Sequence, residues 1–213
     1  MARLRLARLL PLLLLCLAPV VGTAQVPDTS VAPPTSAEED EKDVPYVPTA
    51  PSVVRTMLEV AEVSADDVVY DLGSGDGRIP IMAAKEFGAR AVGIEIDSAL
   101  VAKARAKARE AGVANKVTFH RKDFFDADLT DATVVTLYLW PEINVKLRPK
   151  LLRELDPGDR IVSHDFRMGD WEPEREVDAG KGNTGWETVF RWTVPDPVPA
   201  DLMDTSGEID ETQ

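Results

Sequence analysis

The chain has 213 residues, which is the length of one main domain with short segments outside it. Its formal net charge of −13 disfavours binding to nucleic-acid phosphates through bulk electrostatics, so we expect no nucleic-acid partner. The single cysteine, Cys16, excludes a disulfide within the chain and a thiolate metal site, and two histidines leave little for any other metal site.

The N-terminus has the order of charge and hydrophobicity of an export signal. Basic residues precede an apolar run over residues 9–21, and small residues follow at 22–24. The run is shorter than the roughly 20 apolar residues that a membrane-spanning helix needs. We therefore expect residues 1–24 to be a secretory signal and the protein to be periplasmic or secreted. A short retained membrane anchor and an organelle presequence are the alternatives.

Two polar segments flank the expected domain. Residues 25–43 are rich in Pro, Ser, Thr, Asp and Glu and bury little apolar surface, so they are expected to be a disordered linker. Residues 197–213 are expected to form an acidic tail that frays from residue 200 onward. The folded domain is therefore predicted over residues 44–196.

Hydrophobic periodicity and turn residues predict the elements within this domain. In chain order they are helix 51–63, strand 67–71, helix 78–87, strand 91–95, helix 98–111, strand 116–120, strand 133–139, helix 142–155, strand 160–165 and strand 187–194. Gly88 and Gly112 are suitable helix stops. Pro149 is expected to break the fourth helix and to start a second short one.

Alternation of strands and helices predicts an α/β fold with a mostly parallel sheet and helices on both faces. Ligands of such sheets bind beyond the carboxyl ends of the strands. Acidic and aromatic residues fall at or just past these predicted ends: Asp71, Glu95, Asp123, Tyr138 and Asp165. We expect them to share one rim of the sheet.

The most informative segment runs from Val68 to Ile79, where an apolar strand ends in Asp71 and glycines alternate as Gly-x-Gly-x-Gly. Glycine allows a backbone to approach a nucleotide-like ligand closely. A dinucleotide turn has the spacing Gly-x-Gly-x-x-Gly, which Arg78 interrupts. S-adenosylmethionine (SAM) carries an ammonium and a sulfonium and no phosphate, so an acid before the glycines suits it. The turn predicts a SAM site; a turn that only needs to be tight is the alternative. The residues assigned to cofactor binding here are Asp71, Gly73, Ser74, Gly75 and Gly77.

Further cofactor contacts are predicted after the next two strands. Glu95 is placed to accept hydrogen bonds from both ribose hydroxyls. Asp123 is placed to accept from an adenine amino group, with Phe124 against the ring. The alternatives are a helix cap for Glu95 and an ordinary loop acid for Asp123.

The methyl acceptor is expected beyond the fourth strand, where Tyr138, Trp140 and Glu142 are candidates for shaping its pocket. Aromatic faces hold a cationic amine through cation–π contacts, and a hydrophobic strand end followed by a capped helix is the alternative. The segment 46–49 is either a lid over the ligand or a docking strap. His164 is either a base or a wall of the pocket.

These motifs resemble known families. Asp71 to Arg78, with Glu95 and Asp123, resembles the class I SAM-dependent methyltransferases over about residues 44–194. Residues 45–49, the glycine turn, and residues 161–164 followed by Trp171 resemble a lysine methyltransferase family. Its mitochondrial members modify the ATP synthase c-subunit and the adenine nucleotide translocase, and bacterial relatives are similar.

The resemblance implies a Rossmann-like class I methyltransferase fold and SAM as the cofactor. Residues 71–77 would hold its methionine end, Glu95 its ribose and Asp123 its adenine. The segment after the fourth strand departs from the Asn-Pro-Pro-Tyr motif of nucleobase and glutamine methylation, and it leaves lysine open. The expected function is a protein-lysine N-methyltransferase acting on a basic or lysine-bearing protein. A small-molecule methyltransferase and a noncatalytic SAM-binding module are the alternatives.

A lysine acceptor sets one chemical requirement. Its ammonium, with a reference pKa of about 10.4, must lose a proton before it can attack. Desolvation in an aromatic pocket favours the neutral amine, and Glu142 is a candidate for relaying the proton.

Overall fold

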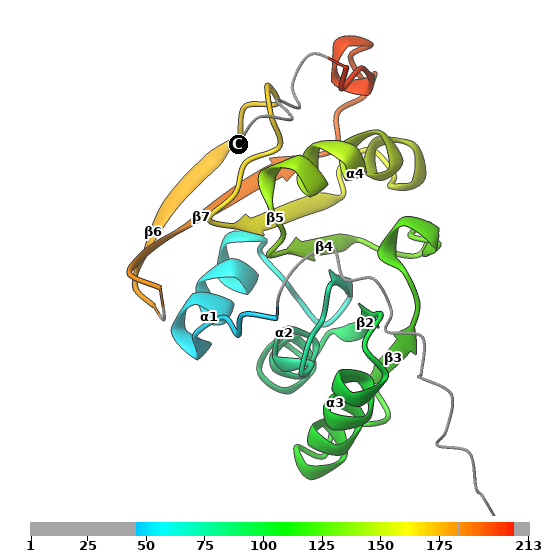
Figure 1. The fold of residues 1–213 in the computed structure, drawn as a ribbon, viewed down its shortest axis with the longest axis vertical. Coiled ribbons are helices and arrows are strands. Elements are labelled where there is room, and N and C mark those ends of the chain that lie inside the picture. Colours follow the sequence, from blue (N-terminus) through cyan, green and yellow to red (C-terminus); the bar gives the residue numbers. More distant parts are fainter. Residues whose placement is uncertain (1–45, 183, 207–213) are drawn as a thin grey trace, which may run out of the picture. The chain divides into compact units, whose positions relative to one another are not determined.

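The computed structural model describes residues 46–182 and 184–206 (Figure 1). The predicted signal and linker lie outside the described residues, as do residues 207–213 of the predicted tail. Within the described part of the chain, no helix combines the length and the apolar character that crossing a membrane requires.

The sheet has seven strands in the order β3-β2-β1-β4-β5-β7-β6. Pairing is parallel from β3 to β5, and β7 runs antiparallel to both β5 and β6. The strands are β1 Val68–Leu72, β2 Arg90–Glu95, β3 Val117–Arg121, β4 Val134–Leu137, β5 Arg160–His164, β6 Arg175–Lys181 and β7 Trp186–Thr193. The predicted α/β class with a mostly parallel sheet is confirmed.

In the described residues, four α-helices, one π-helical segment and two 3-10 turns accompany the strands. They are α1 Pro51–Val60, α2 Arg78–Met82, η1 Ala83–Phe87, α3 Ser98–Glu110, η2 Phe124–Asp126, α4 Pro141–Glu154 and η3 Asp201–Met203. The predicted helix 78–87 is one continuous helix: α2 is its first half, and η1, its second half, is π-helical. It ends at Gly88, where φ is 79°. Asp97 caps α3 by accepting from the backbone of Ala99 and Leu100.

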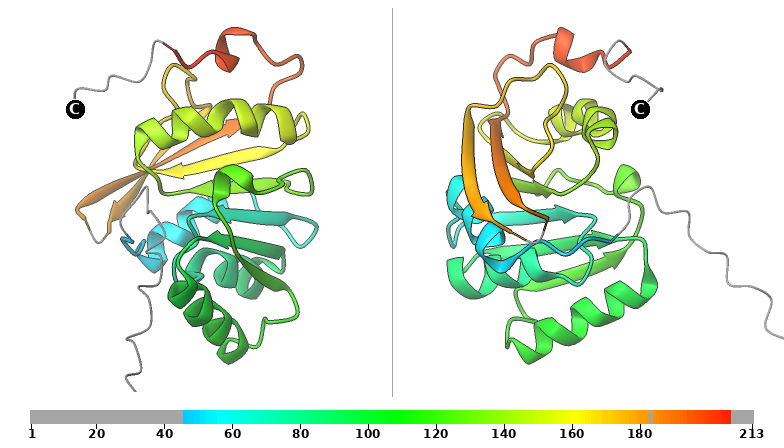
Figure 2. Two further views of the ribbon diagram at one scale, coloured as in Figure 1. Left: turned by 45° about the vertical axis from the view of Figure 1, so that its right-hand side comes forward. Right: turned by 60° about the vertical axis from the view of Figure 1, so that its left-hand side comes forward.

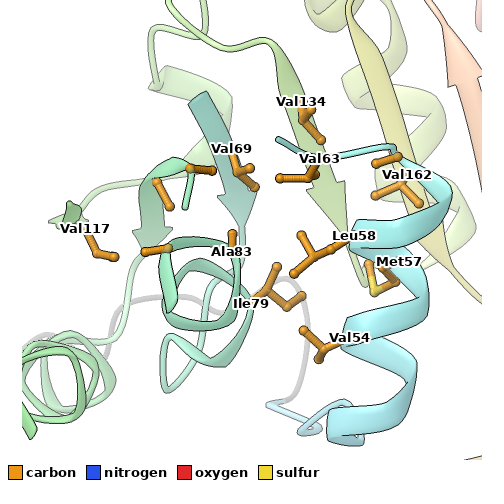
Figure 3. Close-up of a cluster of buried hydrophobic side chains, with 14 of the residues drawn as sticks. Val54, Met57, Leu58, Val63, Val69, Ile79, Ala83, Val117, Val134 and Val162 are labelled. Atoms are coloured by element: carbon orange, nitrogen blue, oxygen red, sulfur yellow. The ribbon is translucent and has the colours of Figure 1, made fainter. Parts of the chain in front are cut away.

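The two faces of the sheet carry separate apolar clusters because side chains of a strand alternate between faces. One face packs against α1, α2 and α3, and Figure 3 shows Leu58 of α1 and Ile79 of α2 meeting Val69 of β1. The other face packs against α4 and the C-terminal turn η3, which lie together in both views of Figure 2. Helices therefore cover both faces, as predicted.

Helix α4 does not break at Pro149, contrary to the expectation. Proline inside a helix removes one hydrogen bond and costs about 3 kcal/mol. The flanking residues Leu147, Leu151 and Leu152 are all buried against the sheet. Each contributes roughly 1.5–3 kcal/mol of burial, so packing outweighs the local cost of the proline.

Strand β6 was not predicted, and the described tail is not frayed. In the β6 sequence, Arg-Glu-Val-Asp-Ala-Gly-Lys, the apolar alternation is limited to Val177 and Ala179, and the segment is extended because it pairs with β7 at the edge of the sheet. In the tail, Leu202 is buried in the second cluster. The fully buried Arg148 donates to the backbone oxygens of Leu202 and Asp204, at 2.8 and 2.9 Å. The expected fraying from residue 200 is therefore wrong at least as far as Asp204.

Candidate active site

The glycine turn follows β1 directly and is held by the neighbouring strand. The backbone N–H groups of Gly73 and Ser74 both donate to the carbonyl oxygen of Ile94, at 3.0 and 2.9 Å. All three alternating glycines have positive φ, between 55° and 78°. At Gly75 an added Cβ would lie 2.5 Å from the ring of Tyr46, so this position requires glycine for space as well as for conformation.

A cavity that is open to solvent lies where β1 and β4 leave the sheet. From β1 the sheet continues to β2 and β3 on one side, and from β4 it continues to β5 on the other. Open α/β sheets bind ligands at such a switch point. Seven of the eight predicted cofactor residues line the cavity: Asp71, Gly73, Ser74, Gly75, Glu95, Asp123 and Phe124. The eighth, Gly77, is at the foot of α2, where a Cβ would lie 2.5 Å from Phe119.

The predicted acceptor residues are not all brought to the cavity. Tyr138 lines it, because β4 ends at Leu137 and leaves the next two residues in the wall. Trp140 is 44% exposed and packs on Phe166, with ring centroids 5.4 Å apart. Glu142 is exposed in the first turn of α4. Neither Trp140 nor Glu142 lines the cavity, so the proposed proton relay through Glu142 has no support in the geometry.

Asp71 is one of the buried acids of the site. It is 3% exposed, and its Oδ1 accepts a 2.7 Å hydrogen bond from the Thr136 hydroxyl of β4. Burial raises the pKa of Asp71 to about 6, although the Thr136 hydrogen bond acts in the opposite direction. A bound cation would restore the ionised form, so the carboxyl is suited to the positively charged end of SAM.

Glu95 holds two parts of the site together. Its Oε2 accepts from the backbone of Gly75 at 2.8 Å, and its Oε1 accepts from the backbone of Asp97 at 2.9 Å. A carboxylate has about four lone-pair positions, so two remain for ribose hydroxyls. The helix-cap alternative is therefore true in part, and it is compatible with the ribose role.

Asp123 begins the η2 turn, where its Oδ1 accepts from the backbone of Phe125 at 2.8 Å. Its other oxygen leaves acceptor capacity for an exocyclic amine. Phe124 lines the same cavity and packs on Phe125, with ring centroids 4.9 Å apart.

Two residues that the sequence analysis did not assign fasten the segment 46–49 over the turn. Arg78 donates twice to Asp76, both at 2.9 Å, and also to the Thr49 carbonyl at 2.6 Å and the Tyr46 hydroxyl at 3.2 Å. Burial raises the pKa of Asp76, but hydrogen bonds from Arg78 and Lys107 outweigh it and hold that pKa well below its usual range. The available sequence signal was two opposite charges two positions apart, with Asp76 between the last two glycines and Arg78 directly after them.

The segment 46–49 is thereby placed as a wall of the cavity. Tyr46, Val47 and Thr49 all line it. The aromatic wall continues through Tyr138, whose ring centroid lies 3.9 Å from that of the buried His164. His164 itself does not line the cavity. It lies behind Thr49 and Tyr138, next to Glu187.

The residues present fit SAM, on the evidence of the cradle at Gly75 and of the two acids at the strand ends. Asp71 with the glycine turn would hold the methionine end, Glu95 the ribose, and Asp123 with Phe124 the adenine. Among the described residues, no group of three or more His, Cys, Asp or Glu side chains is placed to hold a metal ion.

Comparison with known proteins agrees with this geometry. The sequence profile described as the ANTKMT methyltransferase domain matches residues 71–175. A protein-lysine N-methyltransferase of Saccharolobus islandicus is 46% identical over 152 residues, which are 71% of this chain and 94% of that protein. The adenine nucleotide translocase lysine N-methyltransferase of Mus musculus is 39% identical over 138 residues, and the chain spans 59% of its length.

A solved structure from Salinibacter ruber, described as an RNA methyltransferase in complex with S-adenosyl-L-homocysteine, is also similar. It is 57% identical, with a TM-score of 0.69, and the match covers 74% of this chain and all of that chain. A geranyl diphosphate C-methyltransferase from Streptomyces coelicolor shares the fold at 15% identity, with a TM-score of 0.54 and coverage of 66% of this chain and 74% of the other.

Proposed function

Because the chain belongs to the ANTKMT methyltransferase family, with a protein-lysine N-methyltransferase among its relatives, we propose that it methylates the side-chain amine of lysine in a protein. It is an enzyme, a methyltransferase, and its cofactor is SAM. The acceptor protein is of basic or lysine-bearing character.

The observation that carries the proposal is the composition of the lining of one cavity. Acids and glycines line it together with Thr49 and Tyr138, and we assign the wall at Thr49 and Tyr138 to the acceptor as its acceptor end. An aromatic face beside a desolvated wall accepts the alkyl chain and amine of a lysine and favours its neutral form.

SAM supplies an activated methyl group, so this chain has three tasks. The glycine turn and Asp71 fix the position of the cofactor's charged end. The wall made by the segment 46–49 and Tyr138 excludes water and aligns the amine for in-line attack. Such positioning accounts for a large part of the rate of a two-substrate reaction.

The test is methyl transfer from methyl-tritiated SAM by the purified full-length chain, with lysate of the source organism as acceptor. Protein, RNA and low-mass fractions are separated, and Asp71→Ala is the control. We expect labelled protein whose acid hydrolysate contains methylated lysine, and no label with the variant. Label confined to low-mass products would identify a small-molecule methyltransferase instead.

RNA is a second candidate acceptor, because the 57% identical Salinibacter ruber protein is described as an RNA methyltransferase. The net charge of −13 opposes it, since RNA binding draws much of its affinity from phosphate contacts by Lys and Arg. Label in the RNA fraction that is lost on nuclease digestion would select this alternative.

We further propose that residues 1–24 direct the chain out of the cytosol, with retention as an anchor and organelle targeting as the alternatives. The amino-acid order of that segment supports the proposal. SAM is made in the cytosol, so an exported enzyme also needs a route for its cofactor. Intact-mass measurement of the protein from fractionated cells tests this proposal: loss of about 24 residues in the exported fraction is expected, and an uncleaved cytosolic chain would overturn it.

A further inference from the structure

A second cluster of polar side chains lies immediately behind the acceptor end of the cavity. His164 and Glu187 are each 1% exposed, and His164 Nε2 lies 2.9 Å from Glu187 Oε2 and 3.4 Å from Asp165 Oδ2. On the other side of the ring, Nδ1 lies 3.4 Å from the hydroxyl oxygen of Thr49. Thr49 lines the cavity, so the three side chains form a line from the cavity wall into the protein.

Tertiary structure alone assembles this line. Thr49 precedes α1, His164 ends β5, and Glu187 lies on the antiparallel strand β7. Asp165 directly follows β5 with φ at 61°, which is strained for a residue other than glycine. Its backbone N–H donates to the Thr188 carbonyl at 2.7 Å, and its carboxylate Oδ1 accepts from the Thr188 backbone N–H at 2.8 Å. Strain of this kind concentrates at functional sites.

The contacts fix the tautomer of the ring. A carboxylate can only accept, so Nε2 must carry the proton that faces Glu187, which leaves the lone pair of Nδ1 facing Thr49. Nε2 and Glu187 Oε2 lie 2.9 Å apart, and neither atom has another hydrogen-bond partner among the described residues.

The charge states suit proton acceptance. Burial lowers the pKa of His164, against the effect of Asp165 and Glu187, so the ring is neutral at pH 7. Burial raises the pKa of Glu187, but hydrogen bonds from Thr184 and the nearby His164 outweigh it, so Glu187 is ionised. The remaining titratable group against the ring is Tyr138, whose pKa burial raises, so it stays neutral.

We propose that Thr49, His164 and Glu187 form a proton relay that takes the proton from the acceptor amine before methyl transfer. The proposal rests on the proposed function, because only an acceptor that arrives as an ammonium needs such a relay. At pH 7 only about one in 2,500 free lysine side chains is neutral, given a pKa of about 10.4.

The steps balance as follows. The ammonium gives a proton to the hydroxyl oxygen of Thr49 while the Thr49 hydroxyl proton passes to Nδ1 of His164, and the electron pair of the broken N–H bond stays on the amine. The imidazolium that results is stabilised by the carboxylates of Glu187 and Asp165. The amine nitrogen then forms its bond to the methyl carbon, and the electron pair of the broken carbon–sulfur bond stays on sulfur. His164 returns its proton through Thr49 to solvent once the product has left.

The variants that test the relay are Thr49→Val, Thr49→Ser and His164→Gln. His120→Gln is the matched control, because His120 is the other histidine of the chain and is exposed on β3. Calorimetry measures SAM binding, and kcat is measured from pH 5 to 9 with a lysine-bearing protein at saturation.

We expect Thr49→Val and His164→Gln to lower kcat at pH 7 by about 10²–10⁴-fold while SAM affinity changes less than threefold. Thr49→Ser should restore most of the loss. Wild-type kcat should be level above about pH 6.5, because burial holds the pKa of His164 below that usual histidine value, whereas the His164→Gln rate should keep rising through pH 8. Unchanged kcat and pH profile in both variants, or no rescue by serine, would overturn the relay. Loss of SAM binding in Thr49→Val would assign that residue to the cofactor wall and would overturn it as well.

A readout independent of activity separates the relay from the choice of acceptor. In ¹⁵N-histidine-labelled His120→Gln protein, His164 is the single histidine, and its nitrogen shifts report the tautomer. We expect the Nε2–H form, and the Nδ1–H form would overturn the relay. If the wild type labels RNA or low-mass products but not lysine, the proposed function fails while this measurement still stands.

Discussion

Replacing Asp71 with Asn should raise the folding stability of the protein without cofactor and lower its affinity for SAM. Burial raises the pKa of the Asp71 carboxyl from its usual 3.8 to about 6. The folded protein therefore binds more protons at this site than the unfolded chain between these two values, and its stability falls as the pH rises through them. Above about pH 6 the ionised Asp71 costs up to about 3 kcal/mol of folding free energy.

Asparagine is close to isosteric and cannot ionise, so Asp71→Asn should recover most of that energy at pH 8 and little at pH 4. For a domain of this size, each kcal/mol raises the melting temperature by about 2–4 °C. Thermal denaturation of both proteins without cofactor, at pH 4 and pH 8, measures the difference. A destabilised variant at pH 8 would refute the reasoning, because it would mean that the ionised carboxyl is satisfied in the empty site.

Cofactor binding should show the opposite effect. At pH 5 only about one Asp71 side chain in ten is ionised, so wild-type affinity for SAM should be about tenfold lower than at pH 8. The variant should bind weakly at every pH and without this slope. Calorimetric titration from pH 5 to 8 checks both statements. A flat wild-type affinity, or an equal slope in both proteins, would contradict the assignment of Asp71 to the cation.

The remaining predictions concern the wall of the cavity and the tail. Gly75→Ala should lower SAM affinity at least tenfold in calorimetry, because the added Cβ would displace the ring of Tyr46. Gly112→Ala is the control: this glycine also has positive φ, but its Cβ would meet open space, so SAM affinity should be unchanged. Arg78→Lys should free the segment 46–49 and raise its rate of proteolysis several-fold, and equal rates would contradict the fastening role. Leu202→Ala should lower the free energy of unfolding in urea by about 2–3 kcal/mol, whereas a loss below about 0.5 kcal/mol would mean that the tail is not docked.

The sequence by itself determined the fold class and most of the cofactor side of the site. Short apolar runs and helical runs closed by Gly88 and Gly112 are local patterns, and they predicted most strands and helices. Ligands of parallel sheets bind beyond the carboxyl ends of the strands, and this rule predicted that Asp71, Glu95 and Asp123 lie together. The structure has all three in the lining of one cavity.

Tertiary structure decided what depends on distant partners. Pro149 stays within α4 because neighbouring leucines are buried, and β6 is a strand because β7 pairs with it. Glu187 approaches His164 only because β7 runs antiparallel beside β5, and no local pattern encodes which strand a strand will pair with. The sequence therefore determined what each segment forms by itself, and contacts between segments far apart in the chain decided which side chains face the acceptor.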